Sequence, residues 1–231
     1  MLRGVVGDIR SGAQLAFRER GLRGLLVINA VATMAFGAGQ ILYVLVAADR
    51  LDLGAAGVGY LLTAMGVGGI VATPLSARAS NSRQIGRWLV GAGLLVSVPM
   101  ILVSFTQARS VVLALTALEG AAAVVFDVVV LTLLQRSVSE SATGRVFSLT
   151  DALGTLGQTI GSLGAPVLVS AMSLTVALRV SGGLAVVSVL LVTPAVLALA
   201  ARTEVERKRL NATVSRLASV DELAAFDPLE L

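Results

Sequence analysis

Six long apolar stretches constrain this chain of 231 residues more than any other feature of its sequence. Each is close to or longer than the roughly 20 residues that an α-helix needs to cross the hydrocarbon core of a bilayer. The expected spans are residues 22–47, 58–75, 88–105, 111–135, 147–172 and 176–200. Only 14% of the residues are charged, against roughly 25% in soluble proteins, and short loops make neighbouring helices antiparallel. The sequence therefore predicts an all-α membrane protein folded as a six-helix bundle.

Arginine and lysine are unevenly divided between the two sides of these spans. Fifteen of the 18 basic residues lie in or next to the two terminal segments and the second and fourth loops, while Arg50, Arg109 and Arg179 lie in or next to the other loops. Because basic residues concentrate in cytoplasmic loops, we expect a multi-pass protein of the cell (inner) membrane with both termini cytoplasmic. The chain then divides into an amphipathic cytoplasmic linker at 1–21, a six-span unit at 22–201 and a cytoplasmic helical tail at 202–231.

The character of the spans recurs with a period of three. The first and fourth spans carry polar groups in mid-membrane, the second and fifth are rich in glycine, and the third and sixth are the most apolar, each with one proline, Pro99 and Pro194. Three helices repeated with opposite orientation are typical of secondary transporters. We therefore expect two inverted three-helix repeats, with the third and sixth spans facing lipid.

Glu119 and Asp127 stand near the middle of the fourth span. A charge at that depth costs roughly 2.5 to 3.5 kcal/mol on insertion scales. The two acids are about 12 Å apart along the helix and about 80° apart around it, so both can border one cavity at different depths. Loss of water disfavours the charged form of a carboxylate, and no basic residue lies deep inside a span, since Arg23 and Arg179 stand close to span ends. Their partner is then a loop arginine, another chain, a cationic substrate or a proton.

Polar stripes mark the first and fifth spans. In the first span one helix face carries Asn29, Thr33, Phe36, Gln40 and Tyr43. This stripe indicates either interhelical hydrogen bonds or, as we favour, the lining of a water-filled cavity. In the fifth span one face carries Asp151, Thr155, Gln158 and Ser162, and a neighbouring face carries Gly154, Gly157, Gly161 and Gly164. Small residues permit close backbone approach, so we interpret the glycines as a packing surface.

Histidine and cysteine are both absent from the chain. This excludes a disulfide framework, histidine-based catalysis and the usual nitrogen and sulfur metal ligands. No nucleophile motif occurs either. We expect no enzyme activity, no cofactor, no metal and no nucleic-acid partner.

The segment 126–153 reads FDVVVLTLLQRSVSESATGRVFSLTDAL. Its TLLQR run at 132–136, the acidic turn at Glu140 and the GRVF at 144–147 resemble the link between the tenth and eleventh spans of drug-exporter-like members of the major facilitator superfamily. The opening LRGLLVINAVATMAFG at 22–37 is similar to the entry into the seventh span of that family. The resemblance covers residues 1 to about 200 and corresponds to the C-terminal six-helix half.

The resemblance implies a proton-coupled secondary transporter, an antiporter that exports small amphipathic compounds. Two six-helix halves would give alternating access, so we expect a second half in a homodimer or heterodimer. The candidate proton-coupling residues are Asp127, ranked first, and Glu119. The candidate residues of the substrate cavity are Asn29, Thr33, Gln40, Thr155 and Gln158. The candidate gating residues are Arg136, Arg145 and Asp151.

Two features depart from the family pattern, and a third extends it. The loop 76–87, SARASNSRQIGR, lacks the acid of the usual gate motif, and the N-terminal half is not among these six spans. The segment 216–231 is similar to the lead-in of cyclic-nucleotide-binding domains that some members carry, without a nucleotide site. The alternative hypothesis is a non-transporting membrane anchor or sensor module, or a truncated gene remnant, which predicts tolerance of Asp127→Asn and Glu119→Gln.

Overall fold

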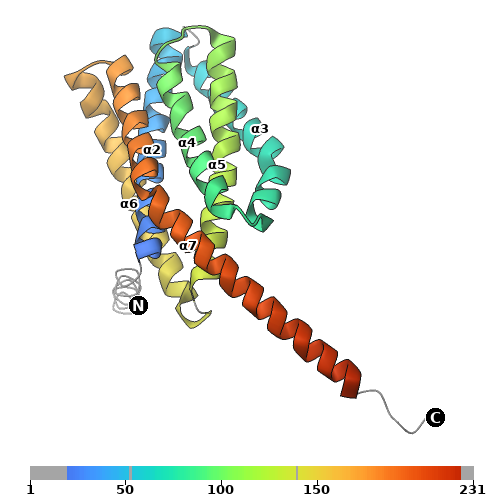
Figure 1. Cartoon of the computed structure of the whole chain (residues 1–231). Coiled ribbons are helices and arrows are strands. Elements are labelled where there is room, and N and C mark those ends of the chain that lie inside the picture. The colour runs from blue at the N-terminus through green and yellow to red at the C-terminus, as the bar shows by residue number, and fades with distance from the viewer. Residues whose placement is uncertain (1–19, 52–53, 139, 225–231) are drawn as a thin grey trace.

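The computed structural model describes residues 20–51, 54–138 and 140–224. The elements within this part are α2 (Arg20–Leu45), the π-helical turn η1 (Val46–Arg50), α3 (Gly54–Asn81), α4 (Ile85–Val103), α5 (Arg109–Ser137), α6 (Glu140–Ala171) and α7 (Leu174–Ala224). Most of the expected linker at 1–21 and the end of the expected tail lie outside the described residues. Helix α7 runs on as one helix beyond the bundle (Figure 1).

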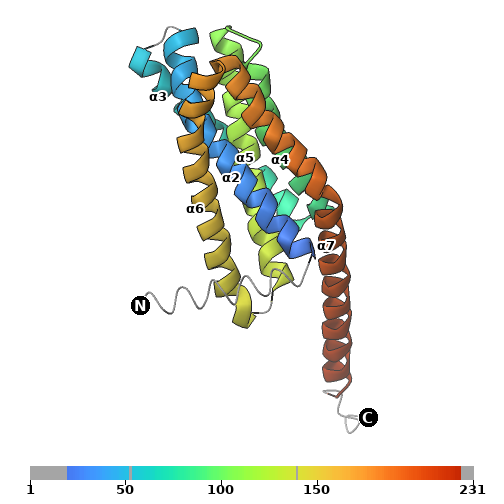
Figure 2. The ribbon, with the colours of Figure 1, turned by 90° about the vertical axis from the view of Figure 1, so that its left-hand side faces the viewer.

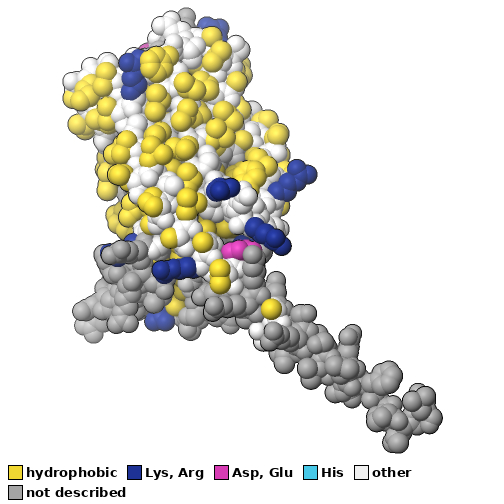
Figure 3. All heavy atoms as spheres, viewed as in Figure 1, with side chains coloured by type: hydrophobic (Ala, Val, Ile, Leu, Met, Phe, Trp, Pro, Cys, Tyr) yellow, Lys and Arg dark blue, Asp and Glu magenta, His cyan; other side chains and the backbone are white. Residues whose placement is uncertain are grey.

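Six segments of the described chain are long and apolar enough to cross a membrane, in agreement with the predicted spans. They are Gly21–Asp49, Ala56–Asn81, Ile85–Val103, Arg109–Ser137, Ala142–Ala171 and Leu174–Val205. Large apolar side chains on their flanks, such as Ile70, Leu163 and Leu191, are 75%, 71% and 75% exposed. Figure 3 shows the apolar flank, with most charged side chains near the ends of the bundle and the α3–α4 hairpin. The chain is therefore a multi-pass membrane protein.

The helices pack as two three-helix repeats, α2–α4 and α5–α7, of opposite orientation. The most extensive contacts join α2 to α6 and α3 to α5, followed by α4 to α5, α4 to α7 and α2 to α7. In the two repeats α2 corresponds to α5, α3 to α6 and α4 to α7. The α2–α6 contact therefore corresponds to the α5–α3 contact, and the α2–α7 contact corresponds to the α5–α4 contact. Figures 1 and 2 show α2 beginning and α7 leaving at the same end of the bundle, here called the basic end. The predicted inverted repeat is confirmed.

Glycines set the close approach at the two main crossings. A Cβ on Gly161 would meet the backbone carbonyl of Met34 on α2, and a Cβ on Gly68 would meet that of Ala117 on α5. Such contacts leave no room for a side chain. Glycine has a low helix propensity, but at these positions it lets the two helix backbones pack closely. The predicted packing role holds for Gly154, Gly157 and Gly161, which lie against α2, whereas Gly164 has open space beside it.

Helix α4 is more enclosed than the sequence predicts. Its Leu89 and Met100 are 0% and 2% exposed and belong to the bundle core. The reason is that α4 packs against α5 and α7, while α7 packs against α2 and α4. Helices α4 and α7 therefore each bury one face. Helices α3 and α6 are the least enclosed within the described chain, which leaves their outer faces open.

Candidate functional site

An open groove of about 380 Å³ lies between α5 and α6, with α2 as its floor. We call it the acidic groove. It is lined by Asn29, Thr33, Asp127, Val128, Val130, Leu131, Leu134, Phe147, Thr150, Asp151, Gly154, Thr155 and Gln158. Among these lining residues are two carboxylates and no arginine or lysine, so the groove carries negative or titratable charge and offers no internal cation to balance it.

The groove exists because α6 packs on α2 rather than on α5. Gly154 lies against the side chains of Asn29 and Thr33, and Gly157 lies against the backbone of α2. The Asn29 Nδ2 donates to the Thr150 carbonyl at 3.4 Å, which adds a polar link between the same two helices. Contacts between α5 and α6 are sparse by comparison. The space between them therefore remains open along one flank.

Asp127 and Asp151 are the charged groups of the acidic groove. Both are exposed in the chain, and within the described part of the structure neither forms a hydrogen bond or an ion pair. Asp127 lies about 15 Å from the end of α5 at Ser137, counting 1.5 Å per residue. That depth is about half of the roughly 30 Å hydrocarbon core. A carboxylate with unused acceptor capacity at this depth, with a second carboxylate in the same groove, can bind a cation, a proton or a polar ligand.

The structure brings together most of the residues singled out from the sequence. Asp127 shares the acidic groove with the predicted cavity residues Asn29, Thr33, Thr155 and Gln158. Asp151, assigned to a gate from the sequence, lies in the same groove. Gln40 does not line it, because it stands two helical turns beyond Thr33 on α2, about 10 Å further along.

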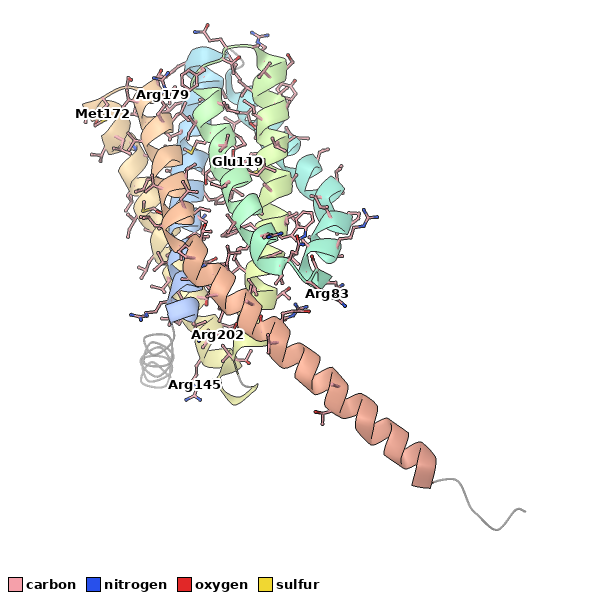
Figure 4. All side chains as sticks on the ribbon, in the orientation of Figure 1. Arg83, Glu119, Arg145, Met172, Arg179 and Arg202 are labelled. Carbon is pink, nitrogen blue, oxygen red and sulfur yellow. The ribbon has the colours of Figure 1, made fainter. Side chains whose placement is uncertain are left out.

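The two predicted gating arginines lie near the basic end. The Arg136 Nη2 donates to the Ser80 carbonyl at 3.0 Å, which ties the end of α5 to the α3–α4 hairpin. Arg145 is exposed on the first turns of α6, and Figure 4 places it at the basic end. Their role as a gate stays a prediction.

Glu119 occupies a different environment from Asp127. It is 4% exposed and lies inside the bundle, away from the labelled arginines (Figure 4). The Tyr43 hydroxyl, itself on a residue that is 7% exposed, donates a hydrogen bond to Glu119 Oε2. Glu119 does not line the acidic groove, so the two acids of α5 do not border one cavity in this conformation. The pair instead links α2 to α5 within the core.

We predict that Tyr43→Phe destabilises the bundle by about 1 to 3 kcal/mol, the penalty for a buried acceptor that loses its partner. The measurement is the free energy of unfolding of the purified chain in mixed micelles. The control is the double variant Tyr43→Phe with Glu119→Leu, which removes both polar groups and should recover part of the loss. Equal stability of Tyr43→Phe and wild type would show that the hydrogen bond contributes nothing.

Six lining residues of the acidic groove were not predicted from the sequence: Val128, Val130, Leu131 and Leu134 on α5, and Phe147 and Thr150 on α6. Phe147 precedes Asp151 by four residues, so extending the polar stripe of α6 by one turn would have reached it. Thr150 donates its hydroxyl to the Val146 carbonyl at 2.8 Å and presents its own carbonyl to Asn29. No sequence signal marks that carbonyl, because its role depends on the α2–α6 crossing.

Two inverted three-helix repeats with a polar groove at mid-membrane define the class of secondary-transporter halves. A sequence model of the Major Facilitator Superfamily matches residues 25–226. The chain therefore belongs to the major facilitator superfamily, a family of transporters. No curated protein and no solved structure matched the chain. The resemblance to the drug-exporter branch and that of the tail stay predictions.

Proposed function

We propose that this chain forms one half of a proton-coupled exporter of small amphipathic compounds, and that the acidic groove is its share of the transport route. The observation that carries the proposal is a pair of carboxylates without described partners in one groove, with Asp127 at mid-membrane depth. A fixed charge there is costly unless it serves ion or substrate movement. Asp127 is the proposed proton-coupling residue, with Asp151 beside it.

The polar lining of the groove also favours the presence of a second six-helix half. Thr155 and Gln158 on α6 and Asp127 on α5 are exposed side by side in the groove. Polar and charged groups at this depth line water-filled cavities or protein contacts rather than lipid. A second half set against the open faces of α3 and α6 would enclose the groove. Rocking of the two halves would then expose it to the two sides in turn.

Glu119 is the second proton-coupling candidate. Glu119 would exchange a proton with the transport path through its hydrogen-bond partner Tyr43. Tyr43 lies on the same polar stripe of α2 as Gln40. Movement of α2 relative to α5 would open the pair to that stripe. Glu119→Gln tests it, because glutamine can keep a hydrogen bond to Tyr43 but cannot exchange a proton.

We propose that the basic end faces the cytoplasm of the cell membrane, in accordance with the positive-inside rule. The chain has no cysteine, so one introduced thiol reports on one position. Asn81→Cys in the α3–α4 hairpin and Gln107→Cys between α4 and α5 are both at exposed residues. In intact cells an impermeant maleimide should label Gln107→Cys and should label Asn81→Cys only after permeabilisation. The reverse pattern would overturn the orientation.

The test of the function is transport by the chain together with a second six-helix half in vesicles. A panel of fluorescent amphipathic cations serves as the probe, with and without an imposed proton gradient. The proposal expects gradient-driven movement of at least one probe and its loss in Asp127→Asn. The observation that favours the anchor or sensor alternative is the continuous helix α7, which extends beyond the bundle to Ala224. It expects no probe movement, and a cellular phenotype that depends on residues 202–231 instead.

A further inference from the structure

A second groove, of about 520 Å³, runs between α3, α4 and α5 near the basic end. We call it the apolar groove. It is lined by Leu75, Gln84, Arg87, Trp88, Gly91, Ala92, Leu95, Leu118, Ala121, Ala122 and Val125. We propose that it binds an anionic phospholipid, with an acyl chain along the apolar part and the phosphate at Arg87. This site is separate from the acidic groove and goes beyond the proposed transport function.

The body of the apolar groove is shaped for a hydrocarbon chain. Small residues form its floor, with Gly91 and Ala92 on α4 and Ala121 on α5, while Leu95 and Leu118 form its walls. A side chain on Gly91 would point into open space, with no atom within 4 Å of its Cβ position. Its volume falls in the roughly 300–1,000 Å³ range of sites that hold small ligands. A flexible acyl chain fits a long apolar groove that is open to the bilayer.

The end of the groove is built for an anionic head group. Arg87 and Gln84 are exposed there, and Trp88 stands beside them, as an aromatic anchor does at the membrane interface. Exposed Arg83 and Arg78 belong to the same α3–α4 hairpin, and Figure 4 shows Arg83 at its tip. Within the described part of the chain, Arg78, Arg83 and Arg87 form no ion pair or hydrogen bond. Guanidinium groups match the oxygens of a phosphate in charge and geometry.

The inverted repeat supplies an internal comparison. The counterpart of the apolar groove lies between α6, α7 and α2, and it measures about 140 Å³. The arginine near it, Arg179, is already engaged: its guanidinium carbon lies 4.1 Å from the centre of the Phe105 ring, and its Nε donates to Ser104 Oγ at 3.0 Å. The counterpart is thus smaller, and its arginine has protein partners. Of these two grooves, the one at the basic end combines apolar volume with unengaged cations, which favours a lipid of the leaflet at that end.

The sole tryptophan of the chain, Trp88, reports directly on this site. The full chain is reconstituted in vesicles, and Trp88 fluorescence is measured with acyl-brominated phosphatidylglycerol or acyl-brominated phosphatidylcholine, which quench on contact. We expect half-maximal quenching at a mole fraction of phosphatidylglycerol at least about fivefold lower than for phosphatidylcholine. A factor of about five per arginine is the scale of surface attraction to anionic lipid.

Variants separate the head-group contact from the acyl-chain contact. Arg83→Gln with Arg87→Gln should equalise the two lipids, while Arg83→Lys with Arg87→Lys should keep most of the preference. Gly91→Leu fills the groove and should raise the half-quenching fraction for phosphatidylglycerol. The matched controls are Gly183→Leu on α7, where the Cβ position is also open, and Arg179→Gln. Both should leave the preference unchanged.

Three outcomes would overturn the proposal. Equal quenching of wild-type Trp88 by the two lipids would show that the groove does not select anionic lipid. A preference that persists in Arg83→Gln with Arg87→Gln would place the selecting charge elsewhere. Protection of Trp88 from both lipids in the assembled protein would show that a protein surface covers the groove.

Discussion

Replacement of Asp127 by asparagine is expected to lower proton-driven transport by about 100-fold or more, the scale that a positioned proton-transfer group contributes. Asparagine keeps the size of the side chain but cannot take up or release a proton. Because Asp127 is exposed in the acidic groove and has no described hydrogen-bond partner, the change should leave folding intact. The readout is gradient-driven movement of fluorescent amphipathic cations in membrane vesicles, normalised to the amount of chain in the membrane.

The matched control for this prediction is Asp49→Asn. Asp49 is also exposed but lies in η1, at the end of the bundle opposite the basic end. Transport should survive this substitution and fall by an intermediate factor in Asp151→Asn, since Asp151 shares the groove with Asp127. Transport by Asp127→Asn at the wild-type rate would show that Asp127 has no part in the mechanism. If Glu119→Gln also transported at the wild-type rate, the anchor or sensor alternative would be favoured.

Gly161→Ala is expected to destabilise the bundle by about 1 to 3 kcal/mol, the usual cost of overpacking. Its new Cβ would meet the backbone carbonyl of Met34 on α2, which cannot move aside as a flexible side chain can. The matched control is Gly164→Ala, one turn along α6, where the Cβ position is open. That control should be neutral or stabilising, because alanine exceeds glycine in helix propensity by about 1 kcal/mol.

The inverted repeat makes the same prediction a second time. Gly68→Ala on α3 would meet the backbone of Ala117 on α5, whereas Gly66→Ala on the same helix has open space. Unfolding of the purified chain in mixed micelles, followed by circular dichroism, measures all four variants. The losses for Gly161→Ala and Gly68→Ala should be of similar size. A loss that is no larger than in the two controls would contradict the close backbone packing of both crossings.

The sequence predicts the outline of this fold well because its signals are local. Span length follows from uninterrupted apolar residues, and the glycine spacing of the fifth span marks one helix face whatever its partner is. Three members of the polar stripe on that span, Asp151, Thr155 and Gln158, line the acidic groove, whereas Ser162 does not. These properties depend on residues three or four positions apart, which a helix brings onto one side.

The differences between the predicted and observed sites depend on how helices are rotated against each other. The separation of about 80° around α5 turns Glu119 toward Tyr43 in the core and Asp127 toward α6. Nothing within the fourth span reveals which of its acids would be buried. Asp151 was assigned to a gate from the sequence, although it shares the polar stripe of Thr155 and Gln158 and lines the acidic groove with them.

The central claim is that the acidic groove couples a proton gradient to the movement of a compound. Its most direct test is a purified assembly of this chain and a second six-helix half in proteoliposomes. Movement of an amphipathic cation is followed there while a proton gradient is imposed and then dissipated with a protonophore. We expect movement that requires the gradient, stops when the gradient is dissipated and is lost in Asp127→Asn. Movement that is indifferent to the gradient, or absent from a folded assembly across the whole panel of probes, would contradict it.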